Sequence, residues 1–399
     1  WHLFFQEVFE NGGFDIVIAN PPYVEFKNLE KSIKNLLEPL YTTLSGKYDL
    51  YIAFIELYVR LLNHGGVSTS IHPTRFMQRD YGTRHLEDLR VVSNSENFEN
   101  IEVCSGKLSE LIWVFQSEST QAMFNKMLNN SIPLSELLDG VYQGIATGKD
   151  DVFLLDENQI ILAKLERNYL KPFLKGKDIS PFKISFKDKF VIYPYDENGR
   201  VFSEAKFKNE APNLYEYLID NRDKLKGRGY FEKSNKIWYE LWNQRNPKRF
   251  EQKKIVTLDN AKKNSFAFDK NNYFGSTTVY NLILKNASDE FYVELLLILN
   301  SKLLNFYHSK NTVPQAGGYL RYQAIFINNL PIKFGLSQDV ISAYINDSDI
   351  VNSEKFLIRV DLEVLRLYEI DYEHVQSIFP ELAKTINKTD YQNSELLNR

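Results

Sequence analysis

The chain has 399 residues, enough for two or three domains, and a formal net charge of −4. Its single cysteine, Cys104, excludes a disulfide framework within the chain, and six scattered histidines without a pair at ligand spacing argue against a metal site. Because no apolar run is long enough to span a membrane and no signal peptide is recognisable, we expect a cytoplasmic protein without a membrane partner.

The first predicted element is a short strand. Residues 16–19 form an apolar run that stops at the tetrapeptide Asn20-Pro21-Pro22-Tyr23. Such a run is typical of a parallel strand covered on both faces. Since the prolines lack an amide hydrogen and have a preset φ, the chain should leave the sheet extended, with free carbonyl oxygens. In open α/β sheets this carboxyl end is where ligands bind.

A helix and a second strand follow. Residues 50–61 place an apolar residue at every third or fourth position, which predicts an amphipathic helix ended by Gly65-Gly66. Residues 67–73 then predict a strand that stops at Pro73. The order strand, helix, strand predicts a parallel α/β crossover. Residues 101–115 predict two further strands.

The pattern changes near residue 132. Up to about residue 332 the predicted strands are short and irregular, with an apolar helix over 291–308 and a Gly-rich loop over 314–321. Residues 356–379 then place Leu357, Val360, Val364 and Leu367 on one face of a helix. We therefore predict three parts: an α/β domain over 1–132, a mixed α+β domain over 133–335, and a helical C-terminal extension over 336–399.

Charge is segregated along the chain. Residues 224–263 contain 12 Lys or Arg and four acids, a net charge of +8, so the remainder carries −12. A segregated basic patch is expected of a DNA-binding surface, although a charge run can also be a solvated face. In the second case we would seek the DNA surface near residues 315–321. The candidate DNA-contacting residues are Lys149, Arg245, Lys248, Arg249, Lys253, Lys254 and Arg321.

The opening tetrapeptide suits a planar base that carries an exocyclic amine. The Asn20 side-chain oxygen and the Pro21 carbonyl can each accept a hydrogen bond from that amine, which favours localisation of its lone pair on nitrogen. Tyr23 offers a flat face on which a base can stack, a contact of about 1 to 3 kcal/mol. A base in a duplex would first have to be flipped out of the helix.

These residues resemble a known family, the amino-group DNA methyltransferases that use S-adenosylmethionine. Asn20-Pro21-Pro22-Tyr23 is similar to their catalytic motif in the form typical of adenine-N6 enzymes, and residues 46–73 resemble the helix and strand that follow it in the gamma class. Residues 141–155, 170–180 and 297–308 resemble the TaqI-like target-recognition domain of type IIG restriction-modification proteins. The resemblance implies a partial Rossmann-like methyltransferase sheet before a target-recognition domain, and double-stranded DNA as partner.

The sequence departs from the family pattern at two places. The family's Gly-rich methyl-donor loop lies upstream of the catalytic motif, and 19 residues precede Asn20. We therefore expect the donor-binding residues in a missing N-terminal portion, upstream of Trp1, and expect this chain alone to be inactive. At Cys104, many relatives place a Phe that packs on the opposite face of the flipped base.

The resulting prediction is a site-specific methyltransferase that moves a methyl group from S-adenosylmethionine to N6 of a flipped adenine, in a restriction-modification system and without a metal. One alternative is a non-catalytic DNA-recognition module with a degenerate methyltransferase half. Another is a methyltransferase of protein glutamine, which shares the tetrapeptide but does not explain a second domain with a basic stretch.

Overall fold

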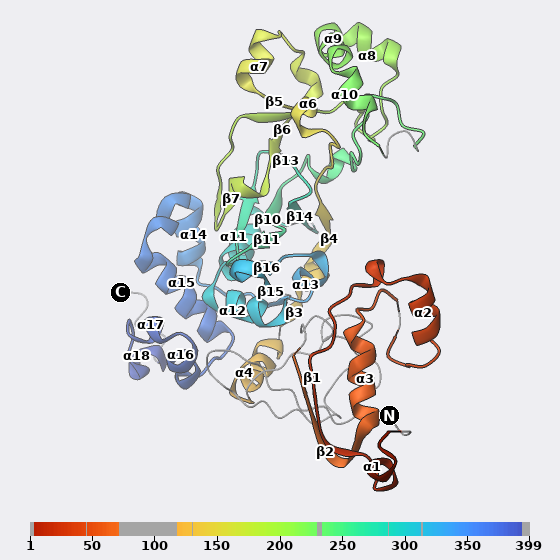
Figure 1. Cartoon of the computed structure of the whole chain (residues 1–399). Helices are drawn as coiled ribbons and strands as arrows, with labels where there is room; N and C mark the ends of the chain where they lie inside the picture. Colours follow the sequence, from red (N-terminus) through yellow and green to blue (C-terminus); the bar gives the residue numbers. More distant parts are fainter. Residues whose placement is uncertain are drawn as a thin grey trace. The chain divides into compact units, whose positions relative to one another are not determined.

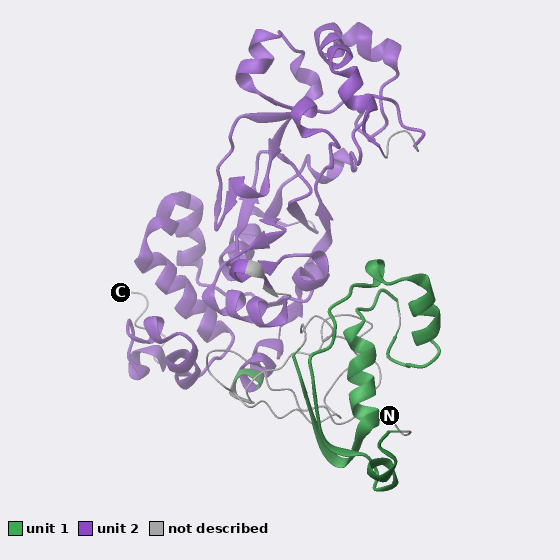
Figure 2. Ribbon diagram, viewed as in Figure 1, with its two compact units in different colours: residues 1–121 green, residues 122–399 purple. Residues whose placement is uncertain are grey.

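The computed structural model describes residues 4–44, 46–71, 118–129, 131–229, 234–285, 287–312 and 314–392. The chain divides into two units, residues 1–121 and 122–399 (Figure 2). Cys104 and the strands predicted within 101–115 lie outside the described residues. The predicted domain limits at residues 132 and 335 stay predictions. Among the described helices, none is both long enough and apolar enough to cross a membrane.

Unit 1 contains the predicted crossover. Its described elements are α1 (Gln6–Glu10), β1 (Phe14–Ala19), α2 (Lys31–Leu37), α3 (Tyr51–Leu61) and β2 (Leu62–Ser70). β1 and β2 pair in parallel, with Ile18 opposite Thr69, and α3 runs alongside them (Figure 1). The chain returns through α3 to the start of the sheet, as two adjacent parallel strands require. The predicted parallel α/β crossover is confirmed.

The helix of unit 1 ends earlier than predicted. α3 stops at Leu61, and Leu62 is extended (φ −76°, ψ 146°) and begins β2. Gly65 and Gly66 lie inside β2, where the pairing with β1 shifts register. A Cβ atom on Gly66 would lie 2.8 Å from the Phe14 carbonyl oxygen. These glycines therefore permit a close approach of two strands at a bulge and do not end the helix.

β1 is more exposed than its sequence predicted. Ile16 and Ile18 are 64% and 78% exposed. Among the described residues of unit 1, β1 and β2 form a two-stranded sheet, and α3 is the helix that packs along both strands. The prediction of a strand covered on both faces is therefore wrong for the described residues, because an apolar run reports strand formation more directly than it reports what covers the strand.

The centre of unit 2 is an antiparallel sheet in the order β12-β10-β14-β4. Its strands are β4 (Leu138–Gln143), β10 (Lys254–Leu258), β12 (Phe266–Asp269) and β14 (Val279–Leu284). All six residues of β14 are buried, and α11 (Asp289–Leu299) packs against β10 and β12 (Figure 1). Beside it lies a small sheet of β11 (Asn260–Ala261), β16 (Tyr319–Arg321) and β15 (Pro314–Gln315).

A second core lies within the same unit, around the sheet β13-β6-β9-β5. Its strands are β5 (Leu154–Asp156), β6 (Leu170–Leu174), β9 (Lys189–Ile192) and β13 (Phe274–Gly275). The helices of this part of the chain are α6 (Asp150–Phe153), α7 (Glu157–Leu162), α8 (Glu204–Glu210), α9 (Pro212–Asp220) and α10 (Arg222–Lys226). The short pairs β3 (Ile132–Pro133) with β17 (Pro331–Ile332) and β7 (Ile179–Ser180) with β8 (Lys183–Ile184) complete the strands of the unit's described residues. The mixed α and β character predicted for this region is confirmed.

The helix predicted over 291–308 is broken in two. α11 ends at Leu299, and the Ser301 hydroxyl caps α12 (Lys302–Asn311) by accepting from the Leu304 amide. The predicted C-terminal helix is likewise α15 (Glu354–Leu367) and α16 (Tyr372–Ile378), and Val360 and Val364 share a core with α11. The remaining described helices are α4 (Glu118–Leu128), α5 (Leu134–Leu137), α13 (Ala324–Ile327), α14 (Gln338–Asn346), α17 (Pro380–Ala383) and α18 (Lys388–Gln392).

Candidate functional site

The tetrapeptide of the sequence analysis lies at the carboxyl end of β1. Asn20 follows the last strand residue directly, and the side chains of Asn20, Pro22 and Tyr23 are exposed. Pro21 is buried, so it anchors the turn while its neighbours face solvent. The four residues therefore lie together at the end of the sheet where ligands bind in α/β folds.

The Tyr23 side chain is held by Ile71, the residue that directly follows β2. Its hydroxyl donates a hydrogen bond of 2.6 Å to the Ile71 carbonyl oxygen and lies 3.5 Å from Oδ1 of Asn20. Its ring meets the Tyr51 ring at 81°, with 6.3 Å between centroids, and the side chain is 52% exposed. Because the single hydroxyl hydrogen serves the shorter contact, Oδ1 of Asn20 keeps its lone pairs for another donor.

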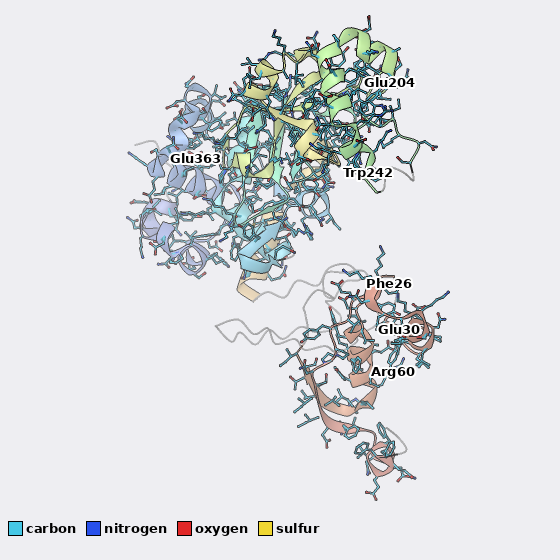
Figure 3. The ribbon with its side chains drawn as sticks, turned by 45° about the horizontal axis from the view of Figure 1, so that its top comes forward. Phe26, Glu30, Arg60, Glu204, Trp242 and Glu363 are labelled. Atoms are coloured by element: carbon cyan, nitrogen blue, oxygen red, sulfur yellow. The ribbon has the colours of Figure 1, made fainter. Side chains whose placement is uncertain are left out.

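The loop after the tetrapeptide is tied to α3 by Glu56, which the sequence analysis did not single out. The 7% exposed carboxylate accepts bonds of 2.7 to 3.2 Å from the amides and hydroxyls of Thr42 and Thr43. Arg60, labelled in Figure 3, adds an ion pair. Burial acts to raise the pKa of Glu56, but the threonine bonds and the Arg60 charge together lower it below its usual value. An acid among the apolar residues of a predicted helix is the signal that identifies such a group.

Lys254 is not on a surface, and its prediction as a DNA-contacting residue is wrong. Its Nζ lies 2.5 Å from Oδ2 of Asp269, both side chains are 0% exposed, and Nζ also donates to the Phe250 carbonyl oxygen over 2.7 Å. Lys254 and Asp269 are direct partners across β10 and β12. Burial lowers the pKa of Lys254 below its usual value, although Asp269 opposes this shift. Lys254 therefore stabilises the pairing of β10 with β12 from within the core.

Three lysines of the predicted set lie at the surface beside polar partners. Nζ of Lys253 lies 2.5 Å from an Asp289 oxygen, and Nζ of Lys149 lies 3.4 Å from an Asp151 oxygen. Lys248 is exposed and donates to the Asn198 side chain over 3.2 Å. Lys248 thus differs from the other two in having a neutral partner, which leaves its charge uncompensated by that contact.

Arg245 and Arg249 lie against the end of β4. Arg245 has a left-handed backbone (φ 58°), and its guanidinium donates long bonds of 3.4 Å to the Gly144 carbonyl oxygen and to Oε1 of Gln143. The Arg249 guanidinium carbon lies 3.8 Å from the centroid of the Tyr142 ring. The loop that carries both arginines also carries Trp242, labelled in Figure 3, which is 38% exposed. Gln143 and Tyr142 were not predicted as site residues.

Arg321 lies at the end of β16, where Nη1 donates a 2.8 Å hydrogen bond to Oδ2 of Asp259. Asp259 directly follows β10, and its amide donates to the Thr278 carbonyl oxygen just before β14. The pair is 62 residues apart in the sequence, and Asp259 was not predicted. Its signal is that it is one of the four acids within the basic stretch.

Arg245 and Arg321 reach the same end of the central sheet. Gln143 at the end of β4 pairs with Tyr280 in β14, and β10 ends beside it at Leu258. Burial raises the pKa of Tyr280 and Asp259 adds to this effect, whereas Arg321 and Arg245 oppose it. The basic stretch and the Gly-rich loop, which the sequence offered as alternatives, therefore meet. We call this set the sheet-end cluster: Gln143, Arg245, Asp259, Tyr280 and Arg321.

Within the described ranges, no group of three or more His, Cys, Asp or Glu side chains could hold a metal ion. Of these four residue types, the sheet-end cluster contains only Asp259, and the tetrapeptide contains none. The chemistry that these two sites offer is therefore hydrogen bonding, ring stacking and attraction of an anion.

Two segments of the chain match known protein families. Residues 1–106 match the Eco57I restriction-modification methylase, and residues 171–332 match the TaqI-like C-terminal specificity domain. The first segment contains the tetrapeptide at Asn20, and the second contains Arg245, Asp259 and Arg321. The resemblance stated from the residues, to restriction-modification methyltransferases with a TaqI-like recognition domain, is confirmed.

Similar full-length proteins agree with these matches. The Type II methyltransferase M.BstVI of Geobacillus stearothermophilus is 23% identical over 91% of this chain and 75% of its own length. The Type II methyltransferase M.PaeR7I of Pseudomonas aeruginosa is 22% identical over 80% of this chain and 65% of its own length. The Type IIL restriction-modification enzyme MmeI, solved in complex with DNA, superposes with a TM-score of 0.53 and 11% identity over 94% of this chain. This chain spans 57% of the MmeI chain, a likeness that concerns the fold alone.

Proposed function

We propose that this chain, which is similar to Type II restriction-modification methyltransferases and contains a match to the TaqI-like specificity domain, transfers a methyl group to N6 of an adenine in duplex DNA. S-adenosylmethionine is the methyl donor of this proposal, and double-stranded DNA is the substrate. Since that substrate would be cellular DNA, the proposed site of action is the cytoplasm.

The observation that carries the proposal is the placement of two acceptors beside an exposed ring. Oδ1 of Asn20 is exposed and receives at most a 3.5 Å contact from the Tyr23 hydroxyl. Among the described residues, no backbone amide donates to the Pro21 carbonyl oxygen, the second acceptor. An exocyclic amine has two hydrogens, so two acceptors can bind both and draw its lone pair out of conjugation with the ring. The nitrogen is then a better nucleophile without any group that must titrate.

Tyr23 supports this chemistry by holding the base. Its ring is half exposed, and its orientation is set at both ends, by the hydrogen bond to Ile71 and by the edge of Tyr51. A preset ring loses little conformational freedom when a base stacks on it, which favours the flipped base over the stacked duplex. Glu56 on α3 accepts hydrogen bonds from the Thr43 amide and hydroxyl and so ties the loop that follows the tetrapeptide to this helix.

The methyl donor is a co-substrate to which no described residue is assigned. The side chains at this strand end, from Asn20 to Tyr23 with Tyr51 and Ile71, include no acid that would hold ribose hydroxyl groups. When bound, S-adenosylmethionine supplies an electrophilic methyl group. The residues described above act on the other reactant, the amine, by binding and orienting it. A segment that completes the donor site is thus part of the proposal.

The alternatives weighed from the sequence are less well supported. The tetrapeptide lies at the strand end with the Asn20 and Tyr23 side chains exposed, whereas a degenerate methyltransferase half would have no reason to keep them. A methyltransferase of protein glutamine shares the tetrapeptide, but a TaqI-like specificity domain is not expected in it. The proposed division of labour is therefore chemistry in unit 1 and DNA specificity in unit 2.

The test is a product analysis with the full-length protein. Duplex DNA is incubated with S-adenosylmethionine, digested to nucleosides and assayed for N6-methyladenine. We expect N6-methyladenine with the native protein and a loss of about 100- to 1000-fold with Asn20→Ala, as for other groups that stabilise a transition state directly. Asn28→Ala, at an exposed asparagine in the same unit, is the matched control and should retain activity. N4-methylcytosine as the product would overturn the adenine assignment.

A further inference from the structure

Arg321 forms an ion pair with Asp259, whereas a cation that binds only phosphate does not need an acidic partner. Oδ2 of Asp259 accepts 2.8 Å bonds from both Nη1 of Arg321 and Nδ2 of Asn260. The two ion-pair partners remain partly open to solvent, at 31% for the Arg321 side chain and 19% for Asp259. Arg321 and Asn260 are also direct partners across β16 and β11. The guanidinium is therefore fixed in place but still accessible.

The backbone beneath this pair is rigid. The Arg321 carbonyl oxygen accepts 2.6 Å from the Thr312 hydroxyl and lies 2.9 Å from Nε2 of His308. His308 is 1% exposed and stacks on the Tyr322 ring with 4.3 Å between centroids. The amide of Tyr322 donates in turn to the Asp259 carbonyl oxygen over 2.9 Å. Arg321 in β16 and Asp259 between β10 and β11 thus both have hydrogen-bonded carbonyl oxygens, which favours the preorganised backbone that a recognition site requires.

The guanidinium still has donors to offer. It carries five N–H groups in a planar fork, and the bond to Asp259 uses one of them. Among the described residues, no second acceptor side chain for it is found within hydrogen-bond distance. A planar pair of N–H groups matches the two acceptors of a guanine edge, O6 and N7, which are neutral. The same pair of N–H groups also matches two oxygens of a phosphate, which carries a negative charge.

The charge of Asp259 decides between these two ligands. A phosphate that approached Arg321 would meet a carboxylate 2.8 Å from the guanidinium, and like charges repel. A neutral base edge pays no such repulsion, so the carboxylate selects against the phosphate and leaves hydrogen bonding as the mode of contact. Exposed lysines with a neutral partner, such as Lys248 beside Asn198, suit the phosphate role instead.

Resting on the proposed function, we propose that Arg321, oriented by Asp259, is a specificity-determining residue that hydrogen-bonds a guanine in the recognition sequence. The neighbourhood suits a close approach of DNA. Gly317 and Gly318 precede β16, have φ values of 76° and 77°, and are exposed. A Cβ atom on Gly318 would meet nothing within 4 Å, so the loop that leads into β16 has open space at this position.

The test is selection of bound duplexes from a randomised library by the 399-residue chain and its variants. We expect the native chain to enrich a consensus that contains a guanine, and Arg321→Ala to lose that preference by roughly 5- to 150-fold at one position while binding random duplex nearly as well. Arg167→Ala, in an exposed arginine–glutamate pair elsewhere in unit 2, is the matched control and should leave the consensus unchanged.

The variant Asp259→Asn distinguishes a loss of base recognition from a loss of the folded state. It removes the charge but keeps an amide oxygen for Arg321, so the freed guanidinium should bind random duplex more tightly and discriminate less. A misfolded variant would bind everything more weakly, which would be checked against the thermal unfolding of both variants. If Arg321→Ala and Asp259→Asn both leave the consensus intact, Arg321 is not a base reader although the proposed function stands. If the native chain enriches no consensus, the proposed DNA recognition fails and this inference with it.

Discussion

The tetrapeptide of unit 1 and the cations of unit 2 differ in how the fold prepares them. Asn20, Pro22 and Tyr23 belong to one tetrapeptide and are exposed, and the bond to Ile71 with the edge of Tyr51 orients the Tyr23 ring. The cations of unit 2 come from distant segments, and most have a partner: Lys254 has Asp269, Lys253 has Asp289, and Arg321 has Asp259. Chemistry on one amine needs few groups, whereas discrimination among DNA sequences needs several groups in a fixed geometry.

A basic stretch in the sequence is therefore not the same as a basic surface. Residues 224–263 carry a net charge of +8, but Lys254 is buried and Arg228, 4% exposed, spends its guanidinium on backbone carbonyl oxygens of Leu225, Glu240 and Trp238. A basic stretch therefore mixes cations that stabilise the fold with cations that can meet a phosphate. Four predictions follow from this comparison of the two units, and the first and last of them separate the two kinds of cation.

The largest effect is expected for Lys254→Ala. The substitution leaves Asp269 buried without its cation, so the free energy of unfolding should fall by about 3 to 5 kcal/mol. Lys253→Ala, at the adjacent but exposed ion pair, is the matched control and should cost about 0 to 1 kcal/mol. Denaturant unfolding of both variants measures the difference. Equal losses would mean that burial does not distinguish the two lysines.

The second prediction concerns a buried acid of unit 2. Burial raises the pKa of Asp361 to about 6, although the amide and charge of Lys302 oppose this. Because the folded pKa lies above the unfolded value, the folded state binds the extra proton, and this stability is present below about pH 4 and lost as pH rises through about 6. Asp361→Asn should therefore raise the free energy of unfolding by about 1 to 3 kcal/mol at pH 7 but not at pH 4.

Thermal unfolding at both pH values checks this, with Asp349→Asn, at an exposed aspartate of the same unit, as the control. A gain that is the same at pH 4 and pH 7 would contradict the assignment, because it would not depend on ionisation. Unit 1 offers the opposite case in Glu56, whose bonds from Thr42 and Thr43 hold the carboxylate ionised.

A third prediction separates the ring of Tyr23 from its hydroxyl. Tyr23→Ala removes the stacking face and should reduce kcat/KM for methylation by the equivalent of about 1 to 3 kcal/mol. Tyr23→Phe keeps the face and loses the bond to Ile71, so a cost of about 0.5 to 1.5 kcal/mol is expected. Steady-state kinetics of the full-length protein gives both values. If Tyr23→Phe is as damaging as Tyr23→Ala, orientation of the ring by the bond to Ile71 matters more than stacking.

The smallest effect is expected for Lys248→Ser. If this exposed lysine meets a phosphate, its loss should weaken binding to all duplexes and reduce the slope of log affinity against log salt by about 0.9. Lys208→Ser, at an exposed lysine of α8, should leave the slope unchanged. A salt titration on cognate and random duplexes measures it. No change for Lys248 would assign it to a solvated face.

The sequence by itself determined the features that depend on near neighbours. An apolar run followed by Asn20-Pro21-Pro22-Tyr23 predicted a strand and the site at its end, and the spacing of apolar residues predicted α3 and the parallel pairing of β1 with β2. These features depend on backbone geometry and on periodicity over a few turns, which local residues control. The end of α3 at Leu61 was missed because β2 begins there and takes up Gly65 and Gly66 in a bulge, and the break at Asn300 was missed because the Ser301 cap starts a new helix.

Tertiary structure alone decided which polar side chains reach a surface. Lys253 and Lys254 are adjacent in the sequence, yet pairing with β12 buries one and leaves the other exposed. The contact between Asp259 and Arg321 likewise exists because β11 and β16 pair across about sixty residues of chain. The environment of a charge depends on the segments packed around it, and those segments are brought together by long-range packing that no local pattern records.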